Sequence, residues 1–508
     1  VPWILILVVF RKDYRAALIL ALTYGSCVLL RELLESEEFR KAESEKASIV
    51  AELNAEAVRL AGEKRALEKQ IADAERSLAK LGRDLQKTKS DRTALTQQLD
   101  ALKTAANGKK GADKDAAMQK VNAAKAKADA AAETEKQQMS EHSALTSECA
   151  ALREKLTECE RCVAENDEKL RDVEAEYRTL MLSLPNLPDP DLKPGGKENN
   201  EPLRYFGEPH KFDFTPKHHV DLCEGLGLID YDRGVKLAGS GFWMYKGMGA
   251  RLEWALLNYF IDCHIADGYE FILPPHMLEY QCGETAGQFP KFADEVYKIA
   301  NPTDDRVHYM LPTAEAALCS IYRDEILTEA ELPRKFFAYT PCFRREAGSG
   351  HADERGMVRG HQFNKVEMFQ FTRPEDSDAA FEELVRKAEN LVKGLGFHFR
   401  TVKLAAGDCS ASMARTYDIE IQIPSMNGYK EVSSVSNARD YQARRGNIRF
   451  RREATGKPEF VHTLNGSGLA TSRIFPAMVE QNQRADGSVV VPEVLRKYLG
   501  GIEVIEKK

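Results

Sequence analysis

The stretch that decides the fold reads Phe343-Arg-Arg-Glu-Ala-Gly-Ser349, and it is followed by Asp353-Glu-Arg-Gly-Met-Val-Arg-Gly-His-Gln-Phe363 and Asn364-Lys-Val-Glu367. Alternation along an extended strand would place Arg344 and Glu346 on one face, so a cation and a carboxylate would project side by side. The segment up to Phe363 is polar and contains glycine, as a loop that closes over phosphates would be. From the residues alone, a surface hairpin with salt bridges is the favoured interpretation.

The region around this stretch, from about Glu201 to Lys508, mixes short β-rich runs with amphipathic helical segments. Pairs of strands lie close together without regular helical crossovers, which favours an antiparallel α+β domain. We expect this domain to occupy residues 226–508. The β-rich runs are Glu270–Leu273, Met368–Phe371, Tyr417–Ile423 and Ser488–Val491, and the helical segments are Gly249–Ala266 and Asp378–Leu395.

Proline and glycine mark the clearest boundary in the chain. Ser183-Leu-Pro-Asn-Leu-Pro-Asp-Pro190 is followed by Pro194 and by Gly195-Gly196, and together these residues forbid a continuing helix. We therefore expect a linker over residues 184–225.

A heptad pattern fills the chain before this boundary. Its apolar residues recur at alternating spacings of three and four, and such a stripe is buried only against another helix. The turn-rich stretch Asn107-Gly-Lys-Lys-Gly-Ala-Asp113 separates two runs of the pattern. We expect one antiparallel coiled-coil arm over residues 36–183, with ~70 residues per helix and a length of roughly 100 Å. Seam positions include Leu53, Leu60, Leu67, Ala74 and Leu81 in the first run, and Leu145, Leu152, Cys159, Leu170 and Tyr177 in the second.

Charge is distributed unevenly along this arm. Between Lys80 and Lys127 there are twelve Lys or Arg and five Asp, a net of +7, whereas Ala128–Ser183 has seven basic and fourteen acidic residues, a net of −7. A charge run on a coiled coil is usually a solvated face. A basic outer half is also a way to reach a phosphate backbone, although the whole chain, at −7, gives no such indication.

Residues 1–35 are predicted to form an apolar helical segment. Val1–Phe10 and Ala16–Leu30 are apolar and are separated by the charged Arg11–Arg15. Neither run reaches the ~20 residues that span a bilayer. A packed helical cap is favoured, and a membrane contact through residues 1–30 or an organelle-targeting segment is the alternative.

The ten cysteines are scattered, and the one CxxC pair, Cys159 and Cys162, lies inside the charged helical repeat without a second ligand pair. Helix packing therefore explains it better than a metal or redox site. Scattered unpaired cysteines indicate a reducing compartment, so we expect a cytoplasmic protein, with an organelle as the alternative. Hydrophobic residues make up 43% of the chain and charged residues 30%, which excludes a mostly disordered protein.

Four ordered stretches between about Arg40 and Gly500 resemble the class II aminoacyl-tRNA synthetases, and specifically the seryl-tRNA synthetase family. The opening stretch resembles the second signature motif of that class, and Pro274-Pro275 stands where the first, dimer-forming motif would be. The remaining stretches are Leu311-Pro-Thr-Ala-Glu315, similar to the substrate loop; Glu431-Val-Ser-Ser434 with Asn437 and Gln442-Ala-Arg-Arg445, similar to the metal-binding strand; and Thr463-Leu-Asn-Gly-Ser-Gly-Leu-Ala470 with Arg473, similar to the third motif.

This resemblance implies a class II catalytic domain with an antiparallel sheet, preceded by a coiled-coil arm that binds tRNA. The implied reaction activates L-serine with ATP to seryl-adenylate and transfers serine to tRNA(Ser), and to tRNA(Sec) where present, in a homodimer that uses Mg²⁺. Two other readings stay open: a paralogue that delivers serine to an acceptor other than tRNA, and a non-catalytic coiled-coil homologue.

The resemblance also implies roles for individual residues. Arg344 and Arg473 would neutralise the charge that ATP and the serine carboxylate bring together. Phe363 would stack on adenine, and Glu367 would receive the serine hydroxyl. The implied serine residues are Thr313, Ala314, Glu315, Glu367 and Ser467; the implied metal ligands are Glu431 and Ser434; and the implied ATP residues are Arg344, Arg345, Glu346, Gly360, His361, Gln362, Phe363, Glu431, Val432, Ser433, Ser434 and Arg473.

The sequence departs from the family pattern at three places. Residues 350–354 replace the usual tip of the second-motif loop, Val435 stands where a cysteine is common, and Thr471-Ser472 precede Arg473 where Val-Gly is frequent. These departures bear on rate and on the handling of the tRNA end, and they leave the implied reaction class unchanged.

Overall fold

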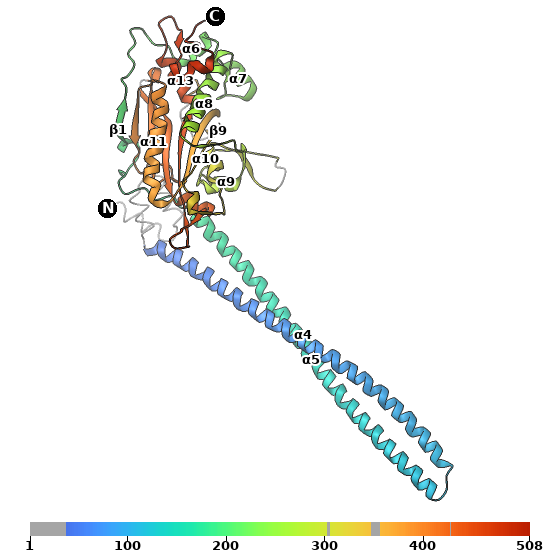
Figure 1. The fold of residues 1–508 in the computed structure, drawn as a ribbon. Helices are drawn as coiled ribbons and strands as arrows, with labels where there is room; N and C mark the ends of the chain where they lie inside the picture. The colour runs from blue at the N-terminus through green and yellow to red at the C-terminus, as the bar shows by residue number, and fades with distance from the viewer. Residues whose placement is uncertain (1–36, 302–304, 347–355, 427, 508) are drawn as a thin grey trace. The chain divides into compact units, whose positions relative to one another are not determined.

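The computed structural model describes residues 37–301, 305–346, 356–426 and 428–507. Two compact units divide the chain, a helical unit of Lys41–Arg178 and a sheet-containing unit that includes Thr179–Lys508 (Figure 1). The apolar segment expected over residues 1–35 lies outside the described residues. Within the described ranges, none of the helices combines the length and the apolar character that crossing a membrane requires.

The helical unit is a hairpin of two long helices, α4 (Glu37–Asn107) and α5 (Ala112–Ser183). The turn falls at residues 108–111, where the polar stretch was expected to interrupt the heptads. The helices are antiparallel, because Lys46 pairs with Glu176 near the start of α4 and Arg92 pairs with Glu135 further along it. The amide of Asn166, a buried polar seam residue, donates to Leu53 O at 3.1 Å. A buried polar group of this kind fixes the register of a coiled coil.

The second unit is built on an eight-stranded sheet. All neighbouring strands are antiparallel except β4, which pairs parallel to β9. The predicted α+β fold with an antiparallel sheet is therefore confirmed. In spatial order the strands are β1 (Glu201–Phe206), β11 (Phe399–Lys403), β12 (Arg415–Ile423), β13 (Gly428–Arg439), β16 (His462–Ala470), β10 (Gln362–Thr372), β9 (Arg334–Phe343) and β4 (Glu270–Ile272).

Alternation along the strands separates two apolar cores on the two faces of this sheet. In β10, Val366 and Met368 belong to the main core, whereas Phe369 and Phe371 belong to a second core. The long helices α8 (Met248–Ala266), α11 (Ser377–Gly394) and α13 (Thr471–Gln481) contribute to the main core, and Figure 1 shows α11 lying along the sheet. The short helices α9 (Tyr280–Thr285), α10 (Glu315–Cys319) and α12 (Tyr441–Gly446) accompany the second core.

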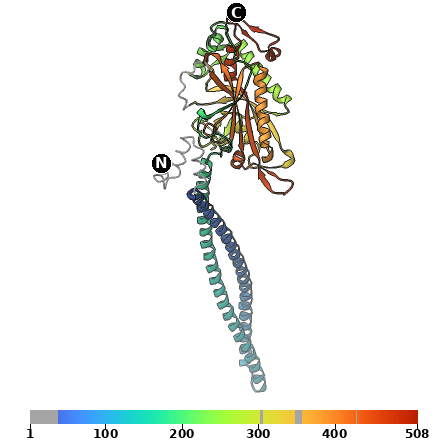
Figure 2. The same cartoon turned by 90° about the vertical axis from the view of Figure 1, so that its left-hand side faces the viewer.

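The segment that was expected to be a linker, residues 184–225, contributes β1 and α6 (His219–Gly225) to the sheet-containing unit, whose sheet is seen from a second direction in Figure 2. The remaining elements are short. They are β2 (Ile229–Asp230), α7 (Tyr231–Ala238), β3 (Met244–Tyr245), β5 (Met277–Glu279), β6 (Tyr297–Lys298), β7 (His308–Met310), β8 (Ile326–Thr328), β14 (Arg449–Arg451), β15 (Pro458–Phe460), β17 (Val489–Val490), α14 (Glu493–Arg496) and β18 (Val504–Ile505).

Candidate active site

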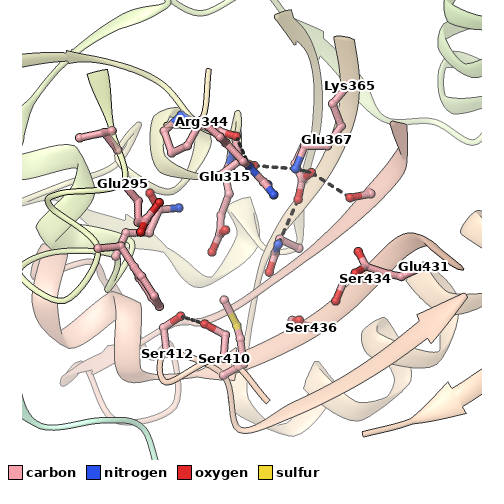
Figure 3. A pocket seen from close by; sticks show the side chains of 18 of the residues that line it. Glu295, Glu315, Arg344, Lys365, Glu367, Ser410, Ser412, Glu431, Ser434 and Ser436 are labelled. Atoms are coloured by element: carbon pink, nitrogen blue, oxygen red, sulfur yellow. Dashed lines mark hydrogen bonds and ion pairs between the residues drawn. The ribbon is translucent and has the colours of Figure 1, made fainter. Parts of the chain in front are cut away.

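A cavity of about 430 Å³ opens on the sheet face opposite α11, and we call it the larger cavity to distinguish it from a cavity of about 80 Å³ beside it; a third cavity of about 500 Å³ adjoins both at Glu431. Strands β10, β13 and β16 supply its floor, and the segment that leads into α10 supplies one wall. Its lining includes Thr313, Glu315, Arg344, Glu346, Lys365, Glu367, Glu431, Ser434, Asn465 and Ser467 (Figure 3).

A buried carboxylate and a buried ammonium lie at the centre of the larger cavity. Glu367 is 1% exposed, and its Oε2 lies 2.5 Å from Lys365 Nζ. The same Nζ donates to Thr313 Oγ1 at 2.7 Å. On the other side, Asn465 Nδ2 donates to Glu367 Oε1 at 3.0 Å, and Ser467 Oγ lies 3.5 Å from Oε2. Because Glu367 is held from both sides, it presents a fixed charge to the cavity.

A second carboxylate, Glu315, faces the same space from the start of α10 (Figure 3). Its Oε1 accepts a hydrogen bond of 2.7 Å from Gln442 Nε2. Burial, and then repulsion by Glu367, raise the pKa of Glu315 to about 7, while the charge of Lys365 acts in the opposite direction. Two carboxylates against one ammonium favour a ligand that brings a further positive charge.

A β-bulge brings Glu431 and Ser434 to the same cavity. Residues three apart on a regular strand point to opposite faces. Here the pairing of β13 with β12 shifts between Glu431 and Ser433, so Val432 is an extra residue, and its side chain joins the main core. Ser434 Oγ donates to Asp418 Oδ1 at 2.8 Å. Burial, followed by the charge of Glu431, raises the pKa of Asp418.

A smaller cavity of about 80 Å³ adjoins the larger one. The guanidinium carbon of Arg344 lies 5.2 Å from the centroid of the Phe363 ring, so the two groups form a cation–π pair. On its far side, Arg473 Nη1 donates to Glu431 O at 2.7 Å and lies 3.3 Å from Glu431 Oε2. The two cavities share Arg344, Glu346, Lys365, Glu431 and Ser467, so ligands in them would touch.

Most of the residues expected at the site line one of these cavities, and five do not. Arg345 Nη1 donates instead to Asp294 O at 2.8 Å, and Ser433 Oγ donates to Ser467 O at 2.7 Å. His361 Nδ1 lies 3.0 Å from Arg344 O, so this side chain supports the backbone of Arg344. The other two are Ala314, which is buried in the second core, and Gln362, which is exposed at the start of β10.

The expectation that Arg344 and Glu346 alternate on one strand is wrong. Strand β9 ends at Phe343, and Glu346 adopts a left-handed backbone conformation with φ of 51°. Both side chains nevertheless line the two cavities. The loop after β9, and not the alternation along a strand, therefore sets the direction of the Arg344 and Glu346 side chains.

Sequence reasoning missed several lining residues, of which Lys365 is the most central. A signal for it was present, because Phe363, Lys365 and Glu367 are spaced two apart and therefore share one face of β10. Other missed residues, from segments far apart in the chain, are Gln288, Phe292, Glu295, Ser410, Ser412, Met413, Ser436 and Asn465.

The three departures from the family pattern lie in different parts of the chain. Residues 350–354 lie outside the described residues, and Val435 is buried in the main core. Thr471 Oγ1 donates to Glu253 Oε1 at 2.6 Å, which ties the segment before Arg473 to α8. Burial raises the pKa of Glu253 to about 7.

Comparison with known proteins places this geometry in context. Residues 297–482 match the family described as the tRNA synthetase class II core domain (G, H, P, S and T). Serine–tRNA ligase 2 of Clostridium acetobutylicum is 66% identical over 339 residues, which cover 66% of this chain and 80% of the relative. Serine–tRNA ligase of a Geobacillus strain is 49% identical over 341 residues, with coverage of 67% and 80%.

Solved structures agree over a larger part of the chain. The seryl-tRNA synthetase from Pyrococcus horikoshii, complexed with ATP, superposes with a TM-score of 0.66 at 29% identity and covers 91% of this chain and 99% of its own. The cytoplasmic serine–tRNA ligase from Naegleria fowleri, in complex with AMP, gives a TM-score of 0.63 at 26% identity, with coverage of 87% and 96%.

Proposed function

Because this chain belongs to the family of serine–tRNA ligases and joins serine to tRNA in an ATP-dependent reaction, we propose how its cavities and its helical hairpin divide that work. The larger cavity takes serine, the smaller cavity and its shared wall take ATP, and the hairpin takes tRNA(Ser), with tRNA(Sec) as a further acceptor where it is present. The observation that carries this assignment is the buried Lys365–Glu367 pair with Glu315 beside it.

Serine fits the charges of the larger cavity. Its ammonium group would lie between Glu315 and Thr313, and its hydroxyl would donate to Glu367, which is already oriented by Asn465. Alanine would leave Glu367 without this partner, which costs on the order of 1–3 kcal/mol. Pyrophosphate exchange into ATP that depends on serine, and that alanine does not support, tests this assignment.

ATP fits the shared wall and the smaller cavity. Phe363 offers a flat face to adenine, although Arg344 now covers one side of it. Arg344 and Arg473 would contact the phosphates from two sides, where charge develops as the serine carboxylate attacks the α-phosphate. A carboxylate nucleophile is already ionised, so catalysis would consist of positioning and electrostatic stabilisation.

Glu431 and Ser434 are suited to hold a Mg²⁺ ion. Both are oxygen donors that the bulge places on one side of β13. The Ser434 hydroxyl donates its hydrogen bond to Asp418, so the lone pairs of its oxygen stay available for a cation. An ion held there would neutralise charge on the ATP phosphates. Glu431 also carries the contact to Arg473, which would orient that side chain.

Replacing Glu431 with glutamine should therefore shift the Mg²⁺ dependence of serine-dependent pyrophosphate exchange. The amide keeps the shape but is a weaker ligand, so half-maximal activity should need ~10-fold more Mg²⁺, and high Mg²⁺ should restore part of the rate. Glu420→Gln is the matched control, since Glu420 pairs with Glu431 across β12 and β13 but is engaged by Arg400. Equal Mg²⁺ titrations for both variants would place the metal elsewhere.

A homodimer is part of the same proposal. The last strand of the sheet, β4, the adjoining α8 and the segment from the end of β4 to the start of β5 carry large apolar side chains that are exposed in the single chain: Trp254, Ile265, Phe271, Leu273 and Met277. Exposed apolar groups beside an open strand edge are the usual mark of a protein interface. A second copy of the chain is the occupant that this family resemblance implies.

Sedimentation velocity should give twice the chain mass for the unaltered protein. Leu273→Glu, at a side chain that is 69% exposed on the proposed interface, should shift the protein toward the single-chain mass. Leu237→Glu on α7, where the leucine is 77% exposed, is the matched control and should leave the mass unchanged. A monomeric unaltered protein would contradict the proposal.

We also propose a cytoplasmic location. Nine cysteines within the described ranges are free thiols, and such thiols persist in reducing compartments.

A further inference from the structure

Helix α12 lies beside the larger cavity, and its residue Gln442 is bonded at every polar position. Gln442 is 1% exposed. Its Nε2 donates to Glu315 Oε1 at 2.7 Å and to Ala286 O at 3.1 Å, and its Oε1 accepts from Thr463 Oγ1 at 2.7 Å. Both amide hydrogens and the carbonyl oxygen are therefore used. A flipped amide would set its oxygen against the Glu315 carboxylate and Ala286 O, so these two acceptors fix which way the amide points, and the Thr463 hydroxyl holds the amide oxygen.

Glu315 depends on this amide for its orientation. It is the first residue of α10, and its backbone N–H contacts Thr313 Oγ1 at 3.3 Å, which fixes the backbone but not the side chain. The carboxylate is buried and is repelled by Glu367. Gln442 donates the hydrogen bond of 2.7 Å that holds Glu315 Oε1, and Gln288, which lines the larger cavity, also interacts with this carboxylate.

The other side of α12 is fixed to the frame of the sheet-containing unit. Arg445 Nε donates to Glu284 O at 2.6 Å, and its Nη2 donates to Phe289 O at 2.5 Å. Tyr441 OH donates to Leu184 O at 2.7 Å, just after the end of α5. The loop that Arg445 holds contains Gln288, which also lines the larger cavity. The helix that carries Gln442 is thus held in place by hydrogen bonds from its neighbours Tyr441 and Arg445.

We propose that Gln442 is a positioning residue for serine recognition, which holds the Glu315 carboxylate against the ammonium group of the substrate. The inference rests on the assignment of Glu315 to serine under the proposed function. It adds a specificity role for a side chain that does not itself line the cavity.

The decisive experiment is a double-mutant cycle between Gln442→Met and Glu315→Gln in serine-dependent pyrophosphate exchange. Methionine keeps the length of the side chain and removes all three hydrogen bonds. Gln442→Met should raise the KM for serine ~10-fold or more, with kcat and the KM for ATP within about twofold. In the Glu315→Gln background the same substitution should add less than about twofold, because its effect passes through that carboxylate.

A milder pair keeps the test valid if Gln442→Met fails to fold. Thr463→Val removes only the hydroxyl that holds the amide oxygen and should raise the KM for serine about threefold to fivefold. Thr463→Ser keeps the hydroxyl and should restore the unaltered value. A role in folding alone would lower the melting temperature of the valine variant without moving this KM.

Three outcomes separate the inference from its premise. An unchanged KM for serine in Gln442→Met or in Thr463→Val overturns the positioning role. Full additivity with Glu315→Gln overturns it as well, since Gln442 would then act on another group. If Glu315→Gln alone leaves the KM for serine unchanged, the assignment of Glu315 to serine fails, and the positioning role fails with it.

Discussion

Glu367→Gln should lower kcat/KM for serine by roughly 10²–10³-fold, the largest effect expected of any single substitution in the larger cavity. The carboxylate is 1% exposed and is paired with Lys365 at 2.5 Å. Removing one partner of a buried pair leaves the other charge uncompensated, which costs about 3–5 kcal/mol. The amide also turns a donor toward Lys365 or toward the serine hydroxyl, so one of these contacts is lost. Glu367→Ala should be at least as severe.

The KM for ATP should stay within about threefold in the same variants, because Glu367 does not line the smaller cavity. Glu389→Gln supplies a matched control. Glu389 is also a buried carboxylate, bonded to Arg204 at 2.6 Å and to Thr401 at 2.6 Å, and it belongs to α11 on the opposite face of the sheet. Its substitution should lower stability without a selective loss for serine. Serine-dependent exchange that survives Glu367→Ala within about tenfold would show that the assigned pocket is wrong.

Shortening the hairpin should separate tRNA charging from serine activation. The cross-helix contacts dictate where to cut, because Gly82 lies opposite His142 and a matched deletion must leave both helices in register. Deleting residues 83–141 and closing the gap with a short turn should leave pyrophosphate exchange within about twofold, since the proposed site residues all lie beyond Pro312. Charging should fall by roughly 100-fold or more, chiefly through the KM for tRNA, because on the proposed function the arm would recognise the shape and backbone of the tRNA. Equal charging by the short and full-length proteins would remove the arm from tRNA binding.

Charge reversal at the tip refines the same experiment. A triple variant with Lys109→Glu, Lys110→Glu and Lys114→Glu should bind tRNA more weakly and with less salt dependence. Each phosphate contact that is lost lowers the number of counterions that binding releases. Lys155→Glu, Lys169→Glu and Arg171→Glu apply the same charge change in the acidic half of the hairpin and serve as the matched control. Similar salt dependence for the two triple variants would mean that overall charge, and not the basic outer half, attracts the tRNA.

Features that depend on local spacing could be predicted from the sequence. Heptads and the Asn107–Asp113 stretch predict two helices and the turn between them, because each depends on residues near one another in the chain. The grouping of Arg344, Phe363, Glu431 and Arg473 around two cavities came from the resemblance of ordered motifs, since their separations in sequence carry no geometry.

Other features depend on contacts between distant segments. Strand β1 was not predicted and lies in the expected linker. Its six residues are largely exposed and show no alternation, and they form a strand only because they pair with β11. Gln442 lies in a stretch that resembles the family, yet its contact to Glu315 crosses 127 positions. The left-handed backbone of Glu346 likewise depends on its loop, not on its own preference.

The extra residue at Val432 determines on which face of β13 the side chains of Glu431 and Ser434 lie. A pleated strand sorts side chains into odd and even sets, and one inserted position exchanges the two sets from that point onward. Substitutions at Val432 alter the packing of the main core and the wall of the smaller cavity, and the two oxygen donors keep a common side. Straightening the strand at this point without removing a residue would reverse the assignment, sending Ser434 into the core and bringing Val435 to the cavity. Deleting Val432 would instead leave Glu431 and Ser434 two positions apart, the spacing at which a regular strand also places both on one side. The Glu-x-x-Ser spacing therefore works here because of the bulge.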